Sequence, residues 1–236
     1  MNDKNMPAAT IKNLSKNYGS FAALKDVNLT LPKGQIIGLL GPNGSGKTTL
    51  IKILTGLITN YRGDVQIDGQ AIGASTKALV SYLPDRNYFA DWMRAKDAIY
   101  LFSDMYRDFN ASKSFQMLER LGLNSEQKIK SMSKGMIDKF QLCLVMSRDA
   151  HLYILDEPLG GVDPAARDFI LDTVLKNYSE DSSVIISTHL ISDVERIFDT
   201  VIFLKQGQVM LCDEIDALRE KTHKSVDQLF REVFKC

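Results

Sequence analysis

Residues 41 to 48 form a glycine-rich loop whose residue types and spacing suit phosphate binding. Glycines let the backbone turn its N–H groups around phosphates, and the start of a following helix adds a favourable field. In the G-x-x-x-x-G-K-[ST] pattern the lysine reaches the β- and γ-phosphates, and the next hydroxyl binds Mg²⁺. The pattern therefore predicts a site for a nucleoside triphosphate. Its residues are Gly41, Pro42, Asn43, Gly44, Ser45, Gly46, Lys47 and Thr48, and Thr49 continues the binding segment.

The segments on either side of this loop supply the strand and the helix that position it. Residues 35–40 are an apolar run typical of a buried strand, and residues 49–57 place apolar side chains at helical spacing. A strand, a glycine loop and a helix are the context that the pattern requires. We therefore expect the loop to join a buried strand to a helix.

Two carboxylates follow a second apolar strand. Residues 152–155 end in Asp156 and Glu157, and parallel strands of an α/β sheet present such groups at their carboxyl ends. Asp156 suits a role beside Mg²⁺, and Glu157 suits the polarisation of an attacking water. An acidic pair at this position also commonly just begins a loop. His189, which closes the next apolar strand, is a lone histidine of a kind that is usually structural.

The first half of the chain changes periodicity twice. Residues 10–34 are strand-like and predict a small antiparallel sheet, and two short strands within 63–84 are expected to extend the nucleotide-binding sheet. Residues 88–150 turn to helical spacing, which predicts a helical insert.

The second half alternates strands and helices. Apolar strands at 151–155 and 183–187 flank a predicted helix at 164–177, and this β-α-β order favours a parallel sheet. Two more strands at 201–205 and 208–211 precede a helical tail at 213–234. We expect residues 10–234 to form a single domain.

Composition excludes several classes of protein. The 29 basic and 29 acidic residues balance, so no global positive charge favours nucleic acid. No apolar run is long enough to cross a bilayer, and residues 1–10 lack the apolar stretch of a signal peptide, so we expect a cytoplasmic protein. Cys143, Cys212 and Cys236 match neither a disulfide framework nor a zinc motif and are expected to stay reduced.

Taken together, these motifs resemble the nucleotide-binding subunits of ATP-binding cassette (ABC) transporters over nearly the whole chain. The resemblance implies an α/β P-loop NTPase with a RecA-like parallel sheet core, an N-terminal antiparallel β-subdomain and a helical subdomain at about 88–150. It also implies ATP and Mg²⁺ as cofactors. Glu157 matches the catalytic glutamate, and His189 matches the switch histidine that contacts the γ-phosphate. Tyr18, 29 residues before Lys47, matches the aromatic residue on which adenine stacks.

The signature loop of that family is altered in this chain. The usual Leu-Ser-Gly-Gly-Gln stands here as residues 132–136, Met-Ser-Lys-Gly-Met. In the family this loop reaches the γ-phosphate of a partner chain, so Ser133 would donate through its hydroxyl and Gly135 through its backbone N–H. Lys134 would either strengthen ATP-driven closure of the dimer or lie in solvent. A second departure places Asp85 where the family carries a glutamine that binds Mg²⁺, and a carboxylate also accepts this ion.

Aromatic residues gather directly after Asp85, in the region where the family receives a short coupling helix of the membrane subunit. Phe89 and Trp92 are the predicted contacts, because they lie in the polar loop before the first helix of the insert. The alternative is that most of these aromatic residues fill the core of the insert. The resemblance thus implies an ATPase subunit that powers a separate transmembrane permease from the inner face of the membrane. It would pair with an identical chain or with a second cassette.

The altered signature looks like that of a subgroup paired with exporter-type (ABC-2) permeases, which favours outward transport. The alternatives are a soluble cassette ATPase acting on DNA or ribosomes, and a regulatory cassette of low turnover. No nucleic acid partner is expected.

Overall fold

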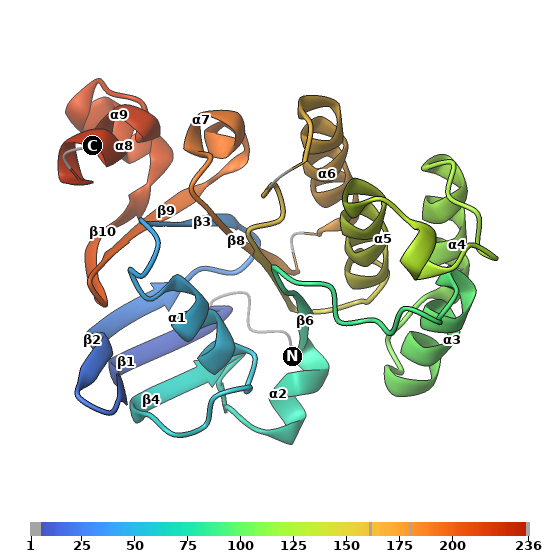
Figure 1. Cartoon of the computed structure of the whole chain (residues 1–236). Helices are drawn as coiled ribbons and strands as arrows, with labels where there is room; N and C mark the ends of the chain where they lie inside the picture. The colour runs from blue at the N-terminus through green and yellow to red at the C-terminus, as the bar shows by residue number, and fades with distance from the viewer. Residues whose placement is uncertain (1–5, 161, 180, 235–236) are drawn as a thin grey trace.

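The computed structural model describes residues 6–160, 162–179 and 181–234, and builds them into two sheets with helices around them (Figure 1). Cys236, which was expected to stay reduced, and residues 1–5 of the stretch in which a signal peptide was not expected lie outside these ranges. Cys143 and Cys212 are free thiols, and burial raises the pKa of Cys143 to about 12. Within the described ranges, no helix combines the length and the apolar character needed to cross a membrane.

The smaller sheet is antiparallel and runs in the order β2-β1-β4-β5. Its strands are β1 (Ala9–Tyr18), β2 (Phe21–Leu31), β4 (Arg62–Ile67) and β5 (Gln70–Ala71). The predicted antiparallel sheet at 10–34 is confirmed. The assignment of β4 to the nucleotide-binding sheet was wrong, because β4 pairs with β1, with Ala9 opposite Ile67, and buries Val65 and Ile67 in the core beneath that sheet.

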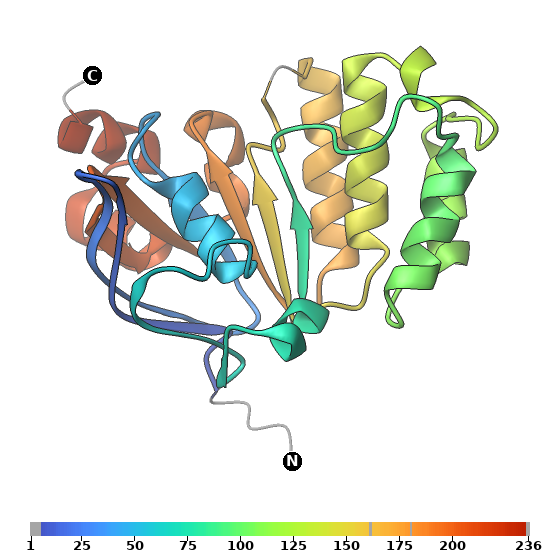
Figure 2. The ribbon, with the colours of Figure 1, turned by 60° about the horizontal axis from the view of Figure 1, so that its bottom comes forward.

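The larger sheet has the order β10-β9-β3-β8-β7-β6, and only its edge strand β10 is antiparallel to its neighbour. The predicted parallel sheet is therefore confirmed, and Figure 2 shows the arrowheads of β6, β7 and β8 at one edge. The functional residues that end these strands must meet at that edge. The strands are β3 (Ile36–Leu40), β6 (Val80–Leu83), β7 (Leu152–Asp156), β8 (Ser183–Thr188), β9 (Thr200–Lys205) and β10 (Gln208–Glu214).

Nine α-helices occur in the described part of the chain: α1 (Lys47–Leu54), α2 (Ala74–Leu79), α3 (Ala95–Met105), α4 (Ala111–Arg120), α5 (Lys134–Met146), α6 (Pro164–Asn177), α7 (Ile191–Val194), α8 (Ile215–Thr222) and α9 (Val226–Phe234). Short 3₁₀ turns occupy Ile129–Ser131 and Glu195–Ile197. The helix expected at 164–177 is found with those bounds. Helix α2 was not expected, whereas residues 88–94 form the loop that was expected before the first helix of the insert. The helical tail is broken at His223, whose φ is 54°.

The larger sheet is buried on both faces, and β3 shows how its alternating residues divide between them. Ile37 and Leu39 join α1 and the antiparallel sheet in one core, whereas Ile36 and Leu40 join α5, α6 and the C-terminal helices in the other. A strand sends successive side chains to opposite faces, so a strand covered on both sides must be apolar throughout. All five residues of β3 are buried as a result.

Candidate nucleotide site

The loop after β3 has the backbone shape that a phosphate requires. Gly44 and Gly46 have φ values of 78° and 112°, a region that disfavours residues with a side chain. A Cβ on Gly46 would lie 2.7 Å from the Ala23 carbonyl oxygen. Helix α1 begins directly at Lys47, and Leu50 N donates to Gly46 O at 2.9 Å. The loop therefore presents the positive end of α1 to the cavity beside it.

The turn between β9 and β10 contacts the phosphate loop and supports it. Gly207 N donates to Ser45 O, and Gly207 O accepts from Lys25 N, both at 2.8 Å. Gly207 has a φ of 80°, and a Cβ there would lie 2.6 Å from Ala23 O. The phosphate loop, β2 and the β9–β10 turn are distant in sequence, and their close approach therefore depends on Gly207.

Replacing Gly207 with alanine should lower the free energy of unfolding by about 2 kcal/mol, because a side chain at this φ is strained and its Cβ collides with backbone. Urea unfolding would measure the change. Gly73→Ala is the matched control, since Gly73 is extended and its nearest neighbour would be 3.8 Å away. Equal stability of the two variants would show that the turn relaxes without cost.

The Lys47 side chain lies inside the loop and faces the carboxylates. Its Nζ donates to Gly41 O at 2.7 Å and to Pro42 O at 3.4 Å, and it lies 3.8 Å from Glu157 Oε1. Burial lowers the pKa of Lys47, and the negative charges of Glu157 and Asp156 partly oppose this shift. A buried ammonium with two carbonyl partners is held in place to meet an incoming anion.

Asp156 ends β7 as a buried carboxylate. Ser187 Oγ on the adjacent β8 donates to Asp156 Oδ1 at 2.6 Å, and the Thr48 hydroxyl also hydrogen-bonds to this carboxylate. Burial raises the pKa of Asp156, the hydrogen bond from Ser187 opposes this, and the charge of Asp85 adds to the increase. Thr48 and Asp156 therefore place two hard oxygen donors side by side, which is the type of ligand that Mg²⁺ prefers.

These residues fit Mg²⁺ as a partial site. Within the described ranges, no group of three or more His, Cys, Asp or Glu side chains could hold a metal ion. Mg²⁺ commonly binds to one or two protein oxygens and completes its shell with substrate phosphates and water. Asp85 lines the same cavity as Thr48 and Asp156, so the structure brings all three predicted metal residues together.

Glu157 and His189 form a pair. His189 Nδ1 lies 2.8 Å from Glu157 Oε2, and Glu157 N donates to the Ser187 backbone and hydroxyl oxygens. Glu157 has a φ of 51°, an uncommon value that turns its carboxylate back toward Lys47. The histidine is half exposed and its partner is an acidic group of the site, so it is not a histidine buried in a core.

A cavity of about 290 Å³ joins Glu157 and the phosphate loop to the β1–β2 hairpin, whereas His189 does not line it. Its lining combines the phosphate loop, three carboxylates and the aromatic end of the hairpin. These residues are Tyr18, Phe21, Ala23, Asn43, Gly44, Ser45, Gly46, Lys47, Thr48, Thr49, Asp85, Asp156 and Glu157. Gly41 and Pro42 contribute the carbonyls that hold Lys47 instead.

The altered signature loop lies outside that cavity. Ser133 caps α5 by accepting from Met136 N at 3.3 Å, and Gly135 has open space around its Cα. Lys134 is exposed, and its Nζ donates to Gly160 O of its own chain at 3.1 Å, so an effect on dimer closure stays a prediction. Within one chain, the structure does not bring Ser133 and Gly135 to the phosphate loop.

A second cavity, an apolar groove of about 820 Å³, runs between the sheet edge and α3. Phe89 lines it, although it is only 8% exposed and packs in the helical core with Phe102 and Phe140, so its role as a contact stays a prediction. Trp92 is 72% exposed but does not line this groove, so its role as a contact also stays a prediction. The groove lining consists of Lys52, Thr55, Leu57, Lys77, Val80, Ser81, Tyr82, Pro84, Tyr88, Phe89, Ala90, Met93, Leu101, Phe102, Met105, Tyr106 and Arg148.

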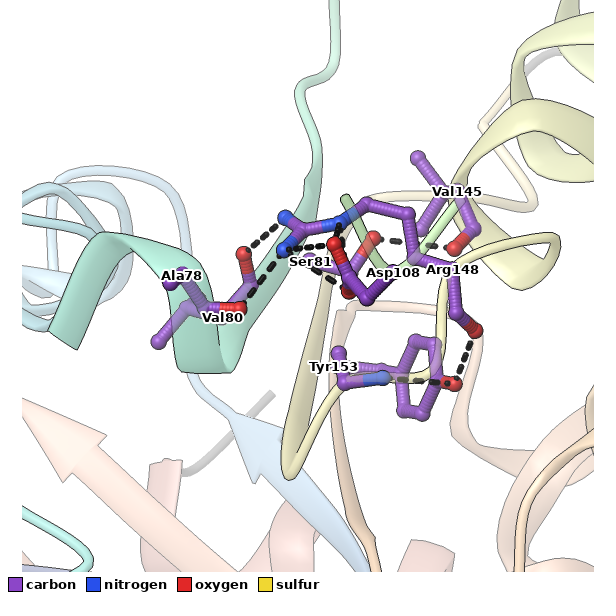
Figure 3. A network of polar contacts seen from close by, with 8 residues as sticks. Ala78, Val80, Ser81, Asp108, Val145, Arg148 and Tyr153 are labelled. Atoms are coloured by element: carbon purple, nitrogen blue, oxygen red, sulfur yellow. Dashed lines mark hydrogen bonds and ion pairs between the residues drawn. The ribbon is translucent and has the colours of Figure 1, made fainter. Parts of the chain in front are cut away.

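Arg148 forms the base of this groove and ties the helical insert to the sheet. It is 4% exposed, and its guanidinium donates to Ala78 O at 2.7 Å and Val80 O at 2.6 Å (Figure 3). It also pairs with Asp108, which follows α3, and lies 4.0 Å from the ring centre of Tyr106. One side chain therefore fixes the connection between three segments.

Sequence reasoning missed three residues of these sites. Ser187 holds Asp156 and could have been noticed as a hydroxyl within an apolar strand next to β7. Phe21 lines the nucleotide cavity, and its place within the strand-like segment 10–34 gave no signal of this. Arg148 gave none either, because its partners are far away in the sequence.

Comparison with known proteins agrees with this geometry. A family model described as ABC transporter matches residues 24–160. The lantibiotic transport ATP-binding protein SrtF of Streptococcus pyogenes is 30% identical over 208 residues, which is 87% of this chain and 90% of SrtF.

Solved structures share the fold. The structure of an ATP-binding subunit of an ABC transporter has a TM-score of 0.84 and 25% identity, covering 96% of this chain and 99% of its own. The dimeric post-hydrolysis state of the ATP-binding cassette MJ0796, bound to ADP and Pi, has a TM-score of 0.77 and 21% identity, covering 87% and 98%. The phosphate loop, the carboxylates at the sheet edge and these matches together show that this chain belongs to the ABC transporter family, as an ATP-binding subunit with the ABC ATPase fold.

Proposed function

We propose that residues 10–234 act as one ATPase domain that hydrolyses ATP in a dimer and drives a separate membrane permease, in the direction of export. The observation that carries this proposal is the meeting of Lys47, the Thr48–Asp156 pair and the Glu157–His189 pair at one edge of the parallel sheet. Phosphoryl transfer needs a cation, a metal site and a group that orients water, and these residues supply all three.

Each residue has a chemical role in this proposal. The loop N–H groups and Lys47 bind and neutralise the phosphates, with Thr49 at the start of α1 beside them. Mg²⁺ bound by Thr48 and Asp156, with Asp85 nearby, would offset the negative charge of the phosphates. Glu157 orients the attacking water, and its distance of 3.8 Å from Lys47 supports a position beside the γ-phosphate. His189 holds the Glu157 carboxylate and contacts that phosphate.

His189→Ala should reduce the rate of ATP hydrolysis by at least about tenfold, because Glu157 loses the partner that orients it. ATP binding should change less than turnover, since Lys47 and the loop remain. A phosphate-release assay beside ATP titration would measure both. The exposed His223→Ala, in the break between α8 and α9, is the matched control. Unchanged turnover in His189→Ala would remove this residue from the mechanism.

A second cassette completes the site in this proposal. Ser133 and Gly135 lie outside the cavity of their own chain, which supports their action on the ATP of a partner chain. The similar fold of the dimeric MJ0796 cassette supports the same arrangement. The partner is an identical chain or a second cassette, and the closed dimer buries both nucleotides.

The apolar groove is the proposed docking site for the permease. Its exposed apolar residues suit the insertion of a short amphipathic helix, and they are Leu57, Tyr88, Leu101 and Met105. The ATPase would then lie on the inner face of the membrane through this contact. The similarity to SrtF, which is named for lantibiotic transport, supports export.

Purification of the tagged chain from gently solubilised membranes of its native cell would test this function. Co-purification of a multi-span protein, together with ATP hydrolysis that depends on Lys47, is the expected result. Recovery only with ribosomes or nucleic acid would instead favour a soluble cassette ATPase. A complex with the permease that binds ATP without turnover would indicate a regulatory cassette.

A further inference from the structure

The β1–β2 hairpin places two aromatic rings on the same face of its sheet. Tyr18 ends β1, Phe21 begins β2, and the turn between them contains Gly19 with a φ of 58°. Tyr18 and Phe21 are direct partners in the antiparallel register. Side chains of directly opposed residues project from the same face of a sheet and lie close together. The hairpin therefore carries a pair of rings at its tip.

Both rings are exposed and face the nucleotide cavity. Tyr18 is 48% exposed and Phe21 is 62% exposed, yet both line the cavity that contains Lys47 and Gly44. Single exposed apolar residues are common, but two aromatic rings beside a phosphate loop form a concave apolar surface that a flat ligand would cover. Phe21 belongs to none of the three hydrophobic cores formed by the described residues, so packing in a core does not account for its ring.

The two ends of the cavity differ in chemistry. The loop end presents N–H groups and a lysine, whereas the hairpin end presents Tyr18, Phe21 and Ala23. The first suits phosphates and the second suits a flat, mostly apolar group. Since a nucleotide joins a charged chain to a planar base, the shape of the cavity assigns the base to the hairpin end.

Lys16 covers part of the Tyr18 ring, which makes the ring of Phe21 important for contact with a base. Its Nζ lies 4.9 Å from the centre of the Tyr18 ring, so a cation of this chain already occupies a position over that ring. Tyr18 is thereby held in orientation, but part of its surface is no longer free. Phe21 supplies additional aromatic surface directly opposite.

We propose that Phe21, together with Tyr18, forms the base-binding end of the nucleotide site and that Phe21 makes the affinity depend on the size of the base. This proposal rests on the proposed function of the phosphate loop. A purine, with two fused rings, covers both aromatic side chains more fully than a pyrimidine does, so stacking should favour ATP over CTP.

Isothermal titration calorimetry of the full chain with MgATP, MgCTP and magnesium tripolyphosphate tests this. Phe21→Ala should weaken ATP binding about tenfold, because loss of a base–aromatic contact has an effect of this size, and should narrow the difference between ATP and CTP. Tripolyphosphate, which has no base, should bind equally to both proteins. Phe21→Tyr should restore ATP affinity, and Leu175→Ala, an exposed apolar residue on α6, should match the wild type.

Two results would overturn the proposal and leave the proposed function intact. Unchanged ATP affinity in Phe21→Ala would show that the ring does not contact the base. An equal loss of ATP and tripolyphosphate affinity would show that Phe21 shapes the phosphate loop instead. Failure of the wild-type chain to bind tripolyphosphate and ATP at all would contradict the proposed function itself, and the inference with it.

Discussion

Replacing Glu157 with glutamine should reduce ATP turnover at least about 100-fold and leave an ATP-bound dimer that persists. The amide has nearly the same shape as the carboxylate, but it cannot accept a proton from water. ATP binding should survive or strengthen, because a negative charge 3.8 Å from Lys47 is removed from the phosphate site. Phosphate release and size-exclusion chromatography with MgATP would measure the two effects.

Glu119→Gln provides the matched control for this experiment. Glu119 is an exposed carboxylate on α4, outside the residues that line the nucleotide cavity, so its substitution makes the same chemical change away from the site. Its turnover should equal that of the wild type. A Glu157→Gln variant as active as the wild type would remove Glu157 from the catalytic role.

Replacing Arg148 with methionine should destabilise the protein by about 3 kcal/mol, as expected when one partner of a buried ion pair is removed. Methionine fills much of the same volume but leaves Asp108 without its cation and the carbonyls of Ala78 and Val80 without their donor. The loss should appear in urea unfolding. It should also loosen the connection between α3 and the sheet, which hydrogen exchange of the segment around Asp108 would report.

An exposed ion pair provides the control for the Arg148 substitution. Arg196 pairs with Asp168 at 2.8 Å, but both side chains are mostly exposed, and such pairs contribute about 0.5 kcal/mol or less. Arg196→Met should therefore unfold almost like the wild type. Equal, small losses in both variants would mean that water or side-chain rearrangement replaces the contacts of Arg148.

Local patterns predicted the parts of the fold that depend on neighbouring residues. The loop ahead of α1 and the helix at 164–177 were predicted correctly, since glycine spacing and helical periodicity act over a few residues. The strand β4 was assigned to the wrong sheet because a short apolar strand does not record which partner it will pair with. The polar loop sequence around Phe89 likewise did not show that this ring packs into the helical core, because its partners Phe102 and Phe140 lie on other segments.

The sequence by itself determined the chemistry of this protein: a phosphate loop, two carboxylates after a buried strand and a histidine after the next one. Only the tertiary structure decided that Ser187 holds Asp156, that His189 pairs with Glu157, that Lys134 contacts Gly160 and that Phe21 joins Tyr18 beside the nucleotide cavity. The physical reason is the distance along the sequence over which each kind of interaction acts. A motif specifies backbone shape and side-chain type over a few residues, whereas these contacts join separate strands and loops whose relative positions follow from the packing of both sheet faces.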